Sequence, residues 1–103
     1  IGKQIIEYIK QNIHRNISIL DVSEKFGVSA SYISKTLRSE YNTSFKLYID
    51  RLRVDAAKKI MNENKDILIK DIAQSLGYDN VISFIRMFKR VEGISPGTYQ
   101  KMR

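Results

Sequence analysis

Basic and hydrogen-bonding side chains occur in two segments of the chain that lie about fifty residues apart. The first segment carries Lys35 and Arg38, and the second carries Arg86 and Lys89. An arginine guanidinium can donate two parallel hydrogen bonds to O6 and N7 of guanine, whereas a lysine ammonium is a point charge that suits a phosphate. The chemistry that these residues favour is recognition of a polyanion, not the making or breaking of bonds.

Residues for nucleophilic or metal-assisted catalysis are scarce. The chain has one histidine, His14, and no cysteine. It therefore lacks the residues that most nucleophilic mechanisms and any thiolate metal site require. His14 has no second ligand at metal-binding spacing, and no Gly-rich phosphate loop, HExxH or GxSxG motif occurs. We predict that the chain is not an enzyme and that it needs neither a metal nor a cofactor.

The composition fits a small folded domain with an anionic partner. Of the 103 residues, 18 are Lys or Arg and 11 are Asp or Glu, which gives a net charge of +7. This balance favours a polyanion through long-range attraction and counterion release, although many small basic domains bind no nucleic acid. The absence of cysteine fits the reducing cytoplasm, and no apolar run is long enough to cross a bilayer. Because the sequence begins at Ile1 without a signal peptide, we expect a piece of a longer protein whose remaining part carries regulation.

Hydrophobic periodicity predicts that the whole chain is helical. Apolar residues recur three and four positions apart, and no alternating strand pattern occurs. Together with capping residues and helix-ending glycines, the pattern predicts an all-α fold of about seven helices. We expect them at residues 2–12, 19–26, 30–41, 44–62, 69–76 and 80–91, with a short last helix from Ser95 and Pro96. The residues expected on the single apolar face of the long helix are Phe45, Tyr48, Ile49, Leu52, Ala56 and Ile60.

An internal repeat relates the two basic segments. The pattern from Ile17 to Gly27 is matched fifty positions later, and after the glycine the offset becomes fifty-one because the second turn is one residue longer. Each copy is a short helix, a glycine turn and a second helix with a basic outer face, and Ser23 or Ala73 supplies the small residue where the two helices cross. This is the construction of a helix-turn-helix, whose second helix enters the major groove of DNA. A plain helical hairpin uses the same caps, but the duplication and the basic outer faces favour the helix-turn-helix.

The carboxy-terminal segment resembles the signature of the AraC/XylS family of bacterial transcription regulators. It reads GYDNVISFIRMFKRVEGISPGTY, and the matching residues are Gly77, Tyr78, Phe84, Arg86, Phe88, Lys89, Gly93, Ser95, Pro96 and Tyr99. The run YIDRLRVDAA, from Tyr48 to Ala57, is similar to the connecting helix of that family. The resemblance implies helix-turn-helix subdomains at residues 1–43 and 63–103, joined by a connecting helix at 44–62.

The resemblance also implies a function and partners. The two recognition helices, at about residues 30–41 and 80–91, would enter successive major-groove segments of double-stranded DNA, and binding would be sequence-specific. The expected partners besides DNA are RNA polymerase and a regulatory domain of the same chain that lies outside these residues. We expect the role to be that of an activator, with repression as the alternative.

The outer faces of the expected recognition helices supply candidate DNA contacts. The candidates for base contact are Ser31, Tyr32, Ser34, Lys35, Arg38, Asn80, Ile82, Ile85 and Arg86. The candidates for backbone contact are Ser29, Arg51, Arg53 and Lys89. Among the candidates for base contact Arg86 ranks first, because its planar guanidinium can donate two parallel hydrogen bonds to guanine. Serine hydroxyls discriminate poorly between bases.

Alternatives stay open for four of these residues. We interpret Ile82 and Ile85 as exposed side chains that contact thymine methyl groups, but the pair could equally pack on another domain. A helical module that binds a partner protein through this pair is the main alternative function, and salt dependence would separate it from DNA binding. For Arg51 and Arg53, the sequence allows phosphate contact, clamping between the subdomains or a solvated surface.

Overall fold

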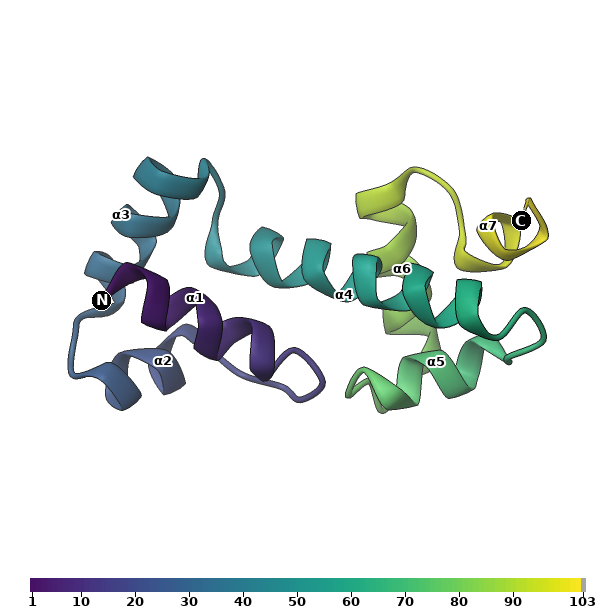
Figure 1. The fold of residues 1–103 in the computed structure, drawn as a ribbon, viewed down its shortest axis with the longest axis horizontal. Coiled ribbons are helices and arrows are strands. Elements are labelled where there is room, and N and C mark those ends of the chain that lie inside the picture. Colours follow the sequence, from purple (N-terminus) through teal and green to yellow (C-terminus); the bar gives the residue numbers. More distant parts are fainter. Residues whose placement is uncertain (103) are drawn as a thin grey trace.

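Seven α-helices make up the fold in the computed structural model, which describes residues 1–102 (Figure 1). They are α1 (Gly2–Gln11), α2 (Ile19–Phe26), α3 (Ala30–Tyr41), α4 (Phe45–Glu63), α5 (Ile69–Ser75), α6 (Val81–Glu92) and α7 (Pro96–Lys101). Residues 1–102 contain no strand, so the all-α prediction is confirmed, and the helix ends lie within about one residue of those expected. None of these helices combines the length and apolar character that crossing a membrane requires.

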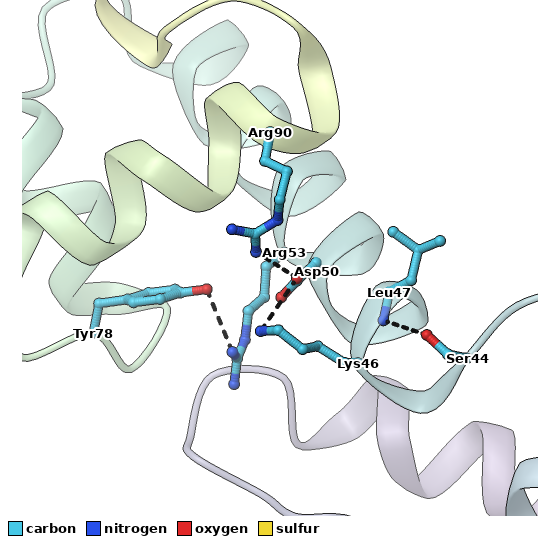
Figure 2. Close-up of polar contacts among 7 residues, drawn as sticks. All are labelled: Ser44, Lys46, Leu47, Asp50, Arg53, Tyr78 and Arg90. Atoms are coloured by element: carbon cyan, nitrogen blue, oxygen red, sulfur yellow. Dashed lines mark hydrogen bonds and ion pairs between the residues drawn. The ribbon is translucent and has the colours of Figure 1, made fainter.

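Side-chain caps explain where most of the helices begin. The hydroxyl oxygens of Ser18, Ser29, Ser44 and Ser95 each accept a hydrogen bond from the backbone N–H three residues later, at 3.0–3.2 Å. Figure 2 shows the bond from Leu47 to Ser44 at the start of α4. Each cap satisfies a backbone donor that the helix itself leaves open, which fixes the first residue of the helix.

Two separate hydrophobic clusters lie at the two ends of α4. The N-terminal helix group (α1–α3) and the first half of α4 share the N-terminal core, whose buried residues are Ile5, Ile6, Ile9, Ile17, Val22, Ile33, Leu37 and Ile49. The C-terminal helix group (α5–α7) and the second half of α4 share the C-terminal core, which buries Val54, Ala57, Met61, Ile72, Ala73, Leu76, Phe84, Met87 and Phe88. The molecule is therefore elongated, 42 × 23 × 22 Å, with α4 running between the two groups (Figure 1).

The connecting helix α4 turns a different face to each core, and the single apolar stripe expected from the sequence is incomplete for its second half. The expected residues Phe45, Tyr48, Ile49 and Leu52 do pack against the N-terminal core. In the second half the expected Ala56 and Ile60 pack against the C-terminal core but are only partly buried, while the fully buried residues are Val54, Ala57 and Met61. The two cores lie at different angles around the helix axis, so one stripe cannot serve both.

Candidate nucleic-acid interface

The helix α3 exposes a polar and basic face. Ile33, Thr36 and Leu37 are buried and define the inner side of the helix, so the opposite side faces solvent. The exposed candidates on this face are Ser31, Tyr32, Ser34, Lys35 and Arg38. Ser34, Lys35 and Arg38 line a groove together with Ser39. No ion pair with a described residue engages Lys35 or Arg38, so the fold does not use either charge.

The helix α6 exposes a face with fewer hydroxyls and one apolar residue. Phe84, Met87 and Phe88 are buried, and Arg86 and Lys89 are exposed on the opposite side. Ile82 is 55% exposed, as expected. Ile85 is only partly exposed because it packs against the C-terminal core, so the expectation of two exposed isoleucines is wrong. The cause is its position on the helix, one residue beyond Phe84 and at the border between the two faces.

Two further candidates act as helix caps. Ser29 caps α3, and the Asn80 side-chain oxygen accepts a hydrogen bond from the N–H of Ile82 at 2.8 Å, which caps α6. A side chain that is held as a cap has less freedom to follow a base edge. Both residues lie at helix amino termini, where backbone N–H groups and the helix dipole favour a phosphate, so their position suits backbone contact better than base readout.

The two connector arginines differ sharply. Arg51 is exposed to solvent. Arg53 is half-buried, and its Nε and Nη2 donate to the backbone carbonyl oxygens of Ile13 and Arg15, both at 2.8 Å. Its Nη1 donates to the Tyr78 hydroxyl at 3.4 Å, and the guanidinium carbon lies 5.2 Å from the centre of the Tyr78 ring (Figure 2). Of the three interpretations of Arg53, the structure supports clamping between the two helix groups.

A second polar contact joins α4 to α6 and was not foreseen from the sequence. The side chain of Asp50 is 5% exposed, and its Oδ2 lies 3.0 Å from Nη2 of Arg90 and 3.6 Å from Nζ of Lys46 (Figure 2). Lys46, four residues before Asp50, was a visible signal for half of this cluster. Arg90 lies 40 residues away in sequence, and no local pattern connects it to Asp50.

The Asp50 cluster forms part of a cleft between the two helix groups. Lys46, Arg53, Arg86 and Arg90 line this cleft with Asp50 as the carboxylate among them. Burial raises the pKa of the nearby Tyr78 phenol, and the hydrogen bond from Arg53 opposes that rise, so the phenol is neutral at neutral pH. The cleft therefore carries an excess of positive charge next to the exposed face of α6.

Comparisons with known proteins agree with this architecture. A family model described as a helix-turn-helix domain matches residues 22–102. The chain is 32% identical over 103 residues to the HTH-type transcriptional regulator YtdP of Bacillus subtilis, with 100% of this chain and 13% of YtdP covered. This chain thus corresponds to a small part of that relative's length.

Several solved structures share the fold, among them the following two. The C-terminal domain of AraT, a response regulator from Geobacillus stearothermophilus, superposes with a TM-score of 0.93 at 26% identity, covering 99% of this chain and 84% of that one. The DNA-binding domain of AdpA, a global transcriptional factor solved in complex with a target DNA, superposes with a TM-score of 0.86 at 17% identity. The latter match covers 98% of this chain and 90% of the AdpA chain, and at that identity it shows a shared fold.

Proposed function

The chain belongs to the AraC/XylS family of helix-turn-helix transcription regulators, and on that premise we propose that it binds specific sequences of double-stranded DNA through α3 and α6. The observation that carries the proposal is the duplicated unit. In both copies the second helix exposes polar and basic side chains that the fold itself does not use. The AdpA domain, which has the same fold, was solved with its target DNA, and this supports the same kind of ligand here.

The dimensions of the chain suit two neighbouring segments of the major groove. The 19 residues of α4 span roughly 28 Å at 1.5 Å per residue. Successive major-groove segments on one face of DNA lie about 34 Å apart. We propose that residues 1–43 and 63–103 act as two subdomains, joined by the connecting helix at 44–62, and that each places its recognition helix in one segment.

The exposed residues suggest distinct roles within the interface. Arg86 would read guanine with two parallel hydrogen bonds, and Ile82 would contact a thymine methyl group. In the first unit, base contacts would come from Ser31, Tyr32, Ser34, Lys35 and Arg38. In the second unit Ile85 is a weaker candidate for base contact, and Asn80, which caps α6, is placed to contact a phosphate. Backbone contacts would come from Ser29, Arg51 and Lys89, joined by Lys46 and Arg90 because both line the basic cleft.

The role of the larger protein extends this proposal. Members of the family are regulators, so the whole protein would control transcription, would not be an enzyme and would work in the cytoplasm next to the DNA. A regulatory domain of the same chain and RNA polymerase would be its other partners. We retain activation as the expected mode. The alternative of a protein-binding helical module loses support, because Ile85 packs inward and leaves Ile82 without its apolar partner.

A selection experiment tests the proposed function. The chain is used to select bound duplexes from a random pool, and binding to the selected site and to a scrambled duplex is measured at 50 and 200 mM salt. We expect the selected site to bind about a thousandfold tighter than the scrambled one, and both affinities to fall steeply with salt. A pool without enrichment, or binding that is insensitive to salt, would contradict the proposal and favour the protein-binding module.

A further inference from the structure

We propose that a packed junction between the two helix groups fixes the orientation of α3 relative to α6, and that the DNA site is therefore selected by the spacing of its two halves. The statement about spacing rests on the proposed function, whereas the statement about rigidity does not. The junction consists of residues 12–16 after α1, Arg53 of α4, and Gly77 and Tyr78 in the turn between α5 and α6.

Arg53 ties three elements together at one point. Its guanidinium donates to two carbonyl oxygens of the loop after α1 and to the phenol of the turn before α6. A guanidinium is planar and its donors point in fixed directions, so these three bonds restrict the relative placement of loop, helix and turn. A lysine at this position would keep the charge, but its single nitrogen cannot make the same set of bonds.

Gly77 brings the two backbones into direct contact. A Cβ added at Gly77 would lie 2.4 Å from the carbonyl oxygen and 2.9 Å from the carbonyl carbon of His14, closer than atoms can approach. Gly27, the matching glycine of the first unit, has a similar left-handed φ of +66° against +86°, but no described atom lies within 4 Å of its added Cβ. The second glycine therefore serves the contact between the helix groups as well as its own turn.

The Asp50 cluster adds a second connection on the cleft side. Arg90 lies near the end of α6, and Asp50 lies in the first half of α4, so their ion pair holds α6 along the connecting helix. Because α4 is one unbroken helix of 19 residues, the N-terminal and C-terminal helix groups cannot turn about a flexible linker. Together with Arg53 and Gly77, the Asp50–Arg90 pair gives three contacts that restrain the same degree of freedom.

A rigid pair of recognition helices is sensitive to the spacing of its site. With about 10–10.5 base pairs per turn, one inserted base pair moves the second half by about 3.4 Å and rotates it by about 35°. A flexible reader could follow that rotation, but a rigid one loses one of its two contacts. The spacing of the two half-sites would thus be read by the junction, which touches neither half itself.

The first test measures rigidity without DNA. The chain has no cysteine, so Ser31→Cys on α3 and Ser83→Cys on α6 introduce two unique sites for spin labels. We expect one narrow distance distribution in the otherwise unchanged chain, and a broader one when Arg53→Lys is added. Lys59→Ala, an exposed position on the same helix, is the control and should leave the distribution narrow. A distribution that Arg53→Lys does not broaden, or one already broad before that change, would overturn the proposed rigidity.

The second test measures spacing on DNA. The selected site is made with zero to two base pairs added or removed between its halves, and each duplex is titrated. For the unchanged chain we expect a loss of at least about tenfold for one base pair in either direction. Arg53→Lys should reduce that loss to less than about threefold while leaving the salt dependence unchanged, because the charge is kept. A spacing profile that is tolerant in the unchanged chain, or identical in Arg53→Lys, would overturn the proposal.

Gly77→Ala and Gly27→Ala form a matched pair for the same experiment. Both add a methyl group at a left-handed glycine, but only Gly77→Ala forces it against His14. Gly77→Ala should flatten the spacing profile, and Gly27→Ala should keep it. If circular dichroism shows that Gly77→Ala does not fold, Arg53→Lys decides the question alone. If the unchanged chain selects no DNA sequence, the proposed function fails, and the spin-label distances still decide whether the junction is rigid.

Discussion

The two helix-turn-helix units have one plan but are stabilised by different contacts. In the first unit, the Ser23 hydroxyl donates to the carbonyl oxygen of Val28 and ties α2 to the turn. In the second unit, the buried Ala73 takes the matching place, and the turn is held from outside by Arg53 and by the contact of Gly77 with His14. Both turns keep a backbone hydrogen bond to this position, from Val28 N–H to the Ser23 carbonyl oxygen at 3.2 Å and from Tyr78 N–H to that of Ala73 at 3.0 Å. The first turn therefore adds a side-chain bond from its own unit, and the second adds contacts with the neighbouring helix group.

The exposed faces of the two recognition helices also differ in the side chains that they carry. The face of α3 is rich in hydroxyl groups, which pair with several bases and discriminate little. The face of α6 carries Arg86 and the exposed Ile82, which suit guanine and the thymine methyl group. We therefore expect the first unit to contribute more affinity and the second more sequence preference.

Removing one aromatic ring should separate the two cores most strongly. Phe88 is fully buried, and the centres of the Phe84 and Tyr99 rings each lie 6.0 Å from its own. Phe88→Ala should lower the free energy of unfolding by about 3–5 kcal/mol, because a large cavity replaces the ring. Hydrogen exchange should show α5–α7 losing protection before α1–α3. Near-unchanged stability would show that the inner face of α6 has been misassigned.

Arg86→Ala and Lys35→Ala compare base reading in the two units. Arg86→Ala should weaken binding to the selected site by about 1–3 kcal/mol and relax preference at one or two adjacent base pairs. Lys35→Ala, at the matching position of α3, should cost less and change preference less, because an ammonium need not choose a base. Titrations on the selected site and its single-base variants measure both effects. If Arg86→Ala reduced specific and non-specific binding equally, its role in base reading would be lost, and DNA shape or the first unit would have to supply specificity.

Ser23→Ala and Ser75→Ala test how each turn is supported. Ser23→Ala removes the bond to the turn of the first unit and should lower the free energy of unfolding by about 0.5–1.5 kcal/mol. Ser75 donates to Ile72 within its own helix, at 2.8 Å, so Ser75→Ala should cost less than about 0.5 kcal/mol. Urea unfolding curves measure the difference. Equal losses of unfolding free energy in the two variants would show that the Ser23 bond does not stabilise the turn of the first unit.

Arg51→Ala should have the smallest effect on DNA affinity, and the effect should be the same for every DNA sequence. Arg51 is exposed on the connecting helix, so its expected contact is a phosphate. Its removal should weaken binding to every sequence alike and reduce the slope of log affinity against log salt by about one unit. An unchanged slope would place Arg51 outside the interface.

Features set by local sequence were predictable. Serine and asparagine caps, helix-ending glycines and apolar spacing depend on residues within about four positions of one another, and they predicted the helix bounds closely. The same spacing predicted the exposed residues of α3, since Ile33 and Leu37 define the opposite side.

Features set by contact between distant segments were not predictable. The second buried face of α4 depends on the angle between the two cores, and the partial burial of Ile85 depends on how the C-terminal core closes over α6. The partners of Arg53 lie 25 to 40 residues away, so the sequence could suggest a clamp but not choose it over phosphate contact.

A chemical footprint tests most directly whether both recognition helices engage the major groove. The chain is bound to several strong selected sites, and protection of guanine N7 and of the sugar backbone is mapped at single-base resolution. We expect two protected major-groove segments on one face of the duplex, centred about 10 base pairs apart. Protection of a single segment on all of these sites would contradict it.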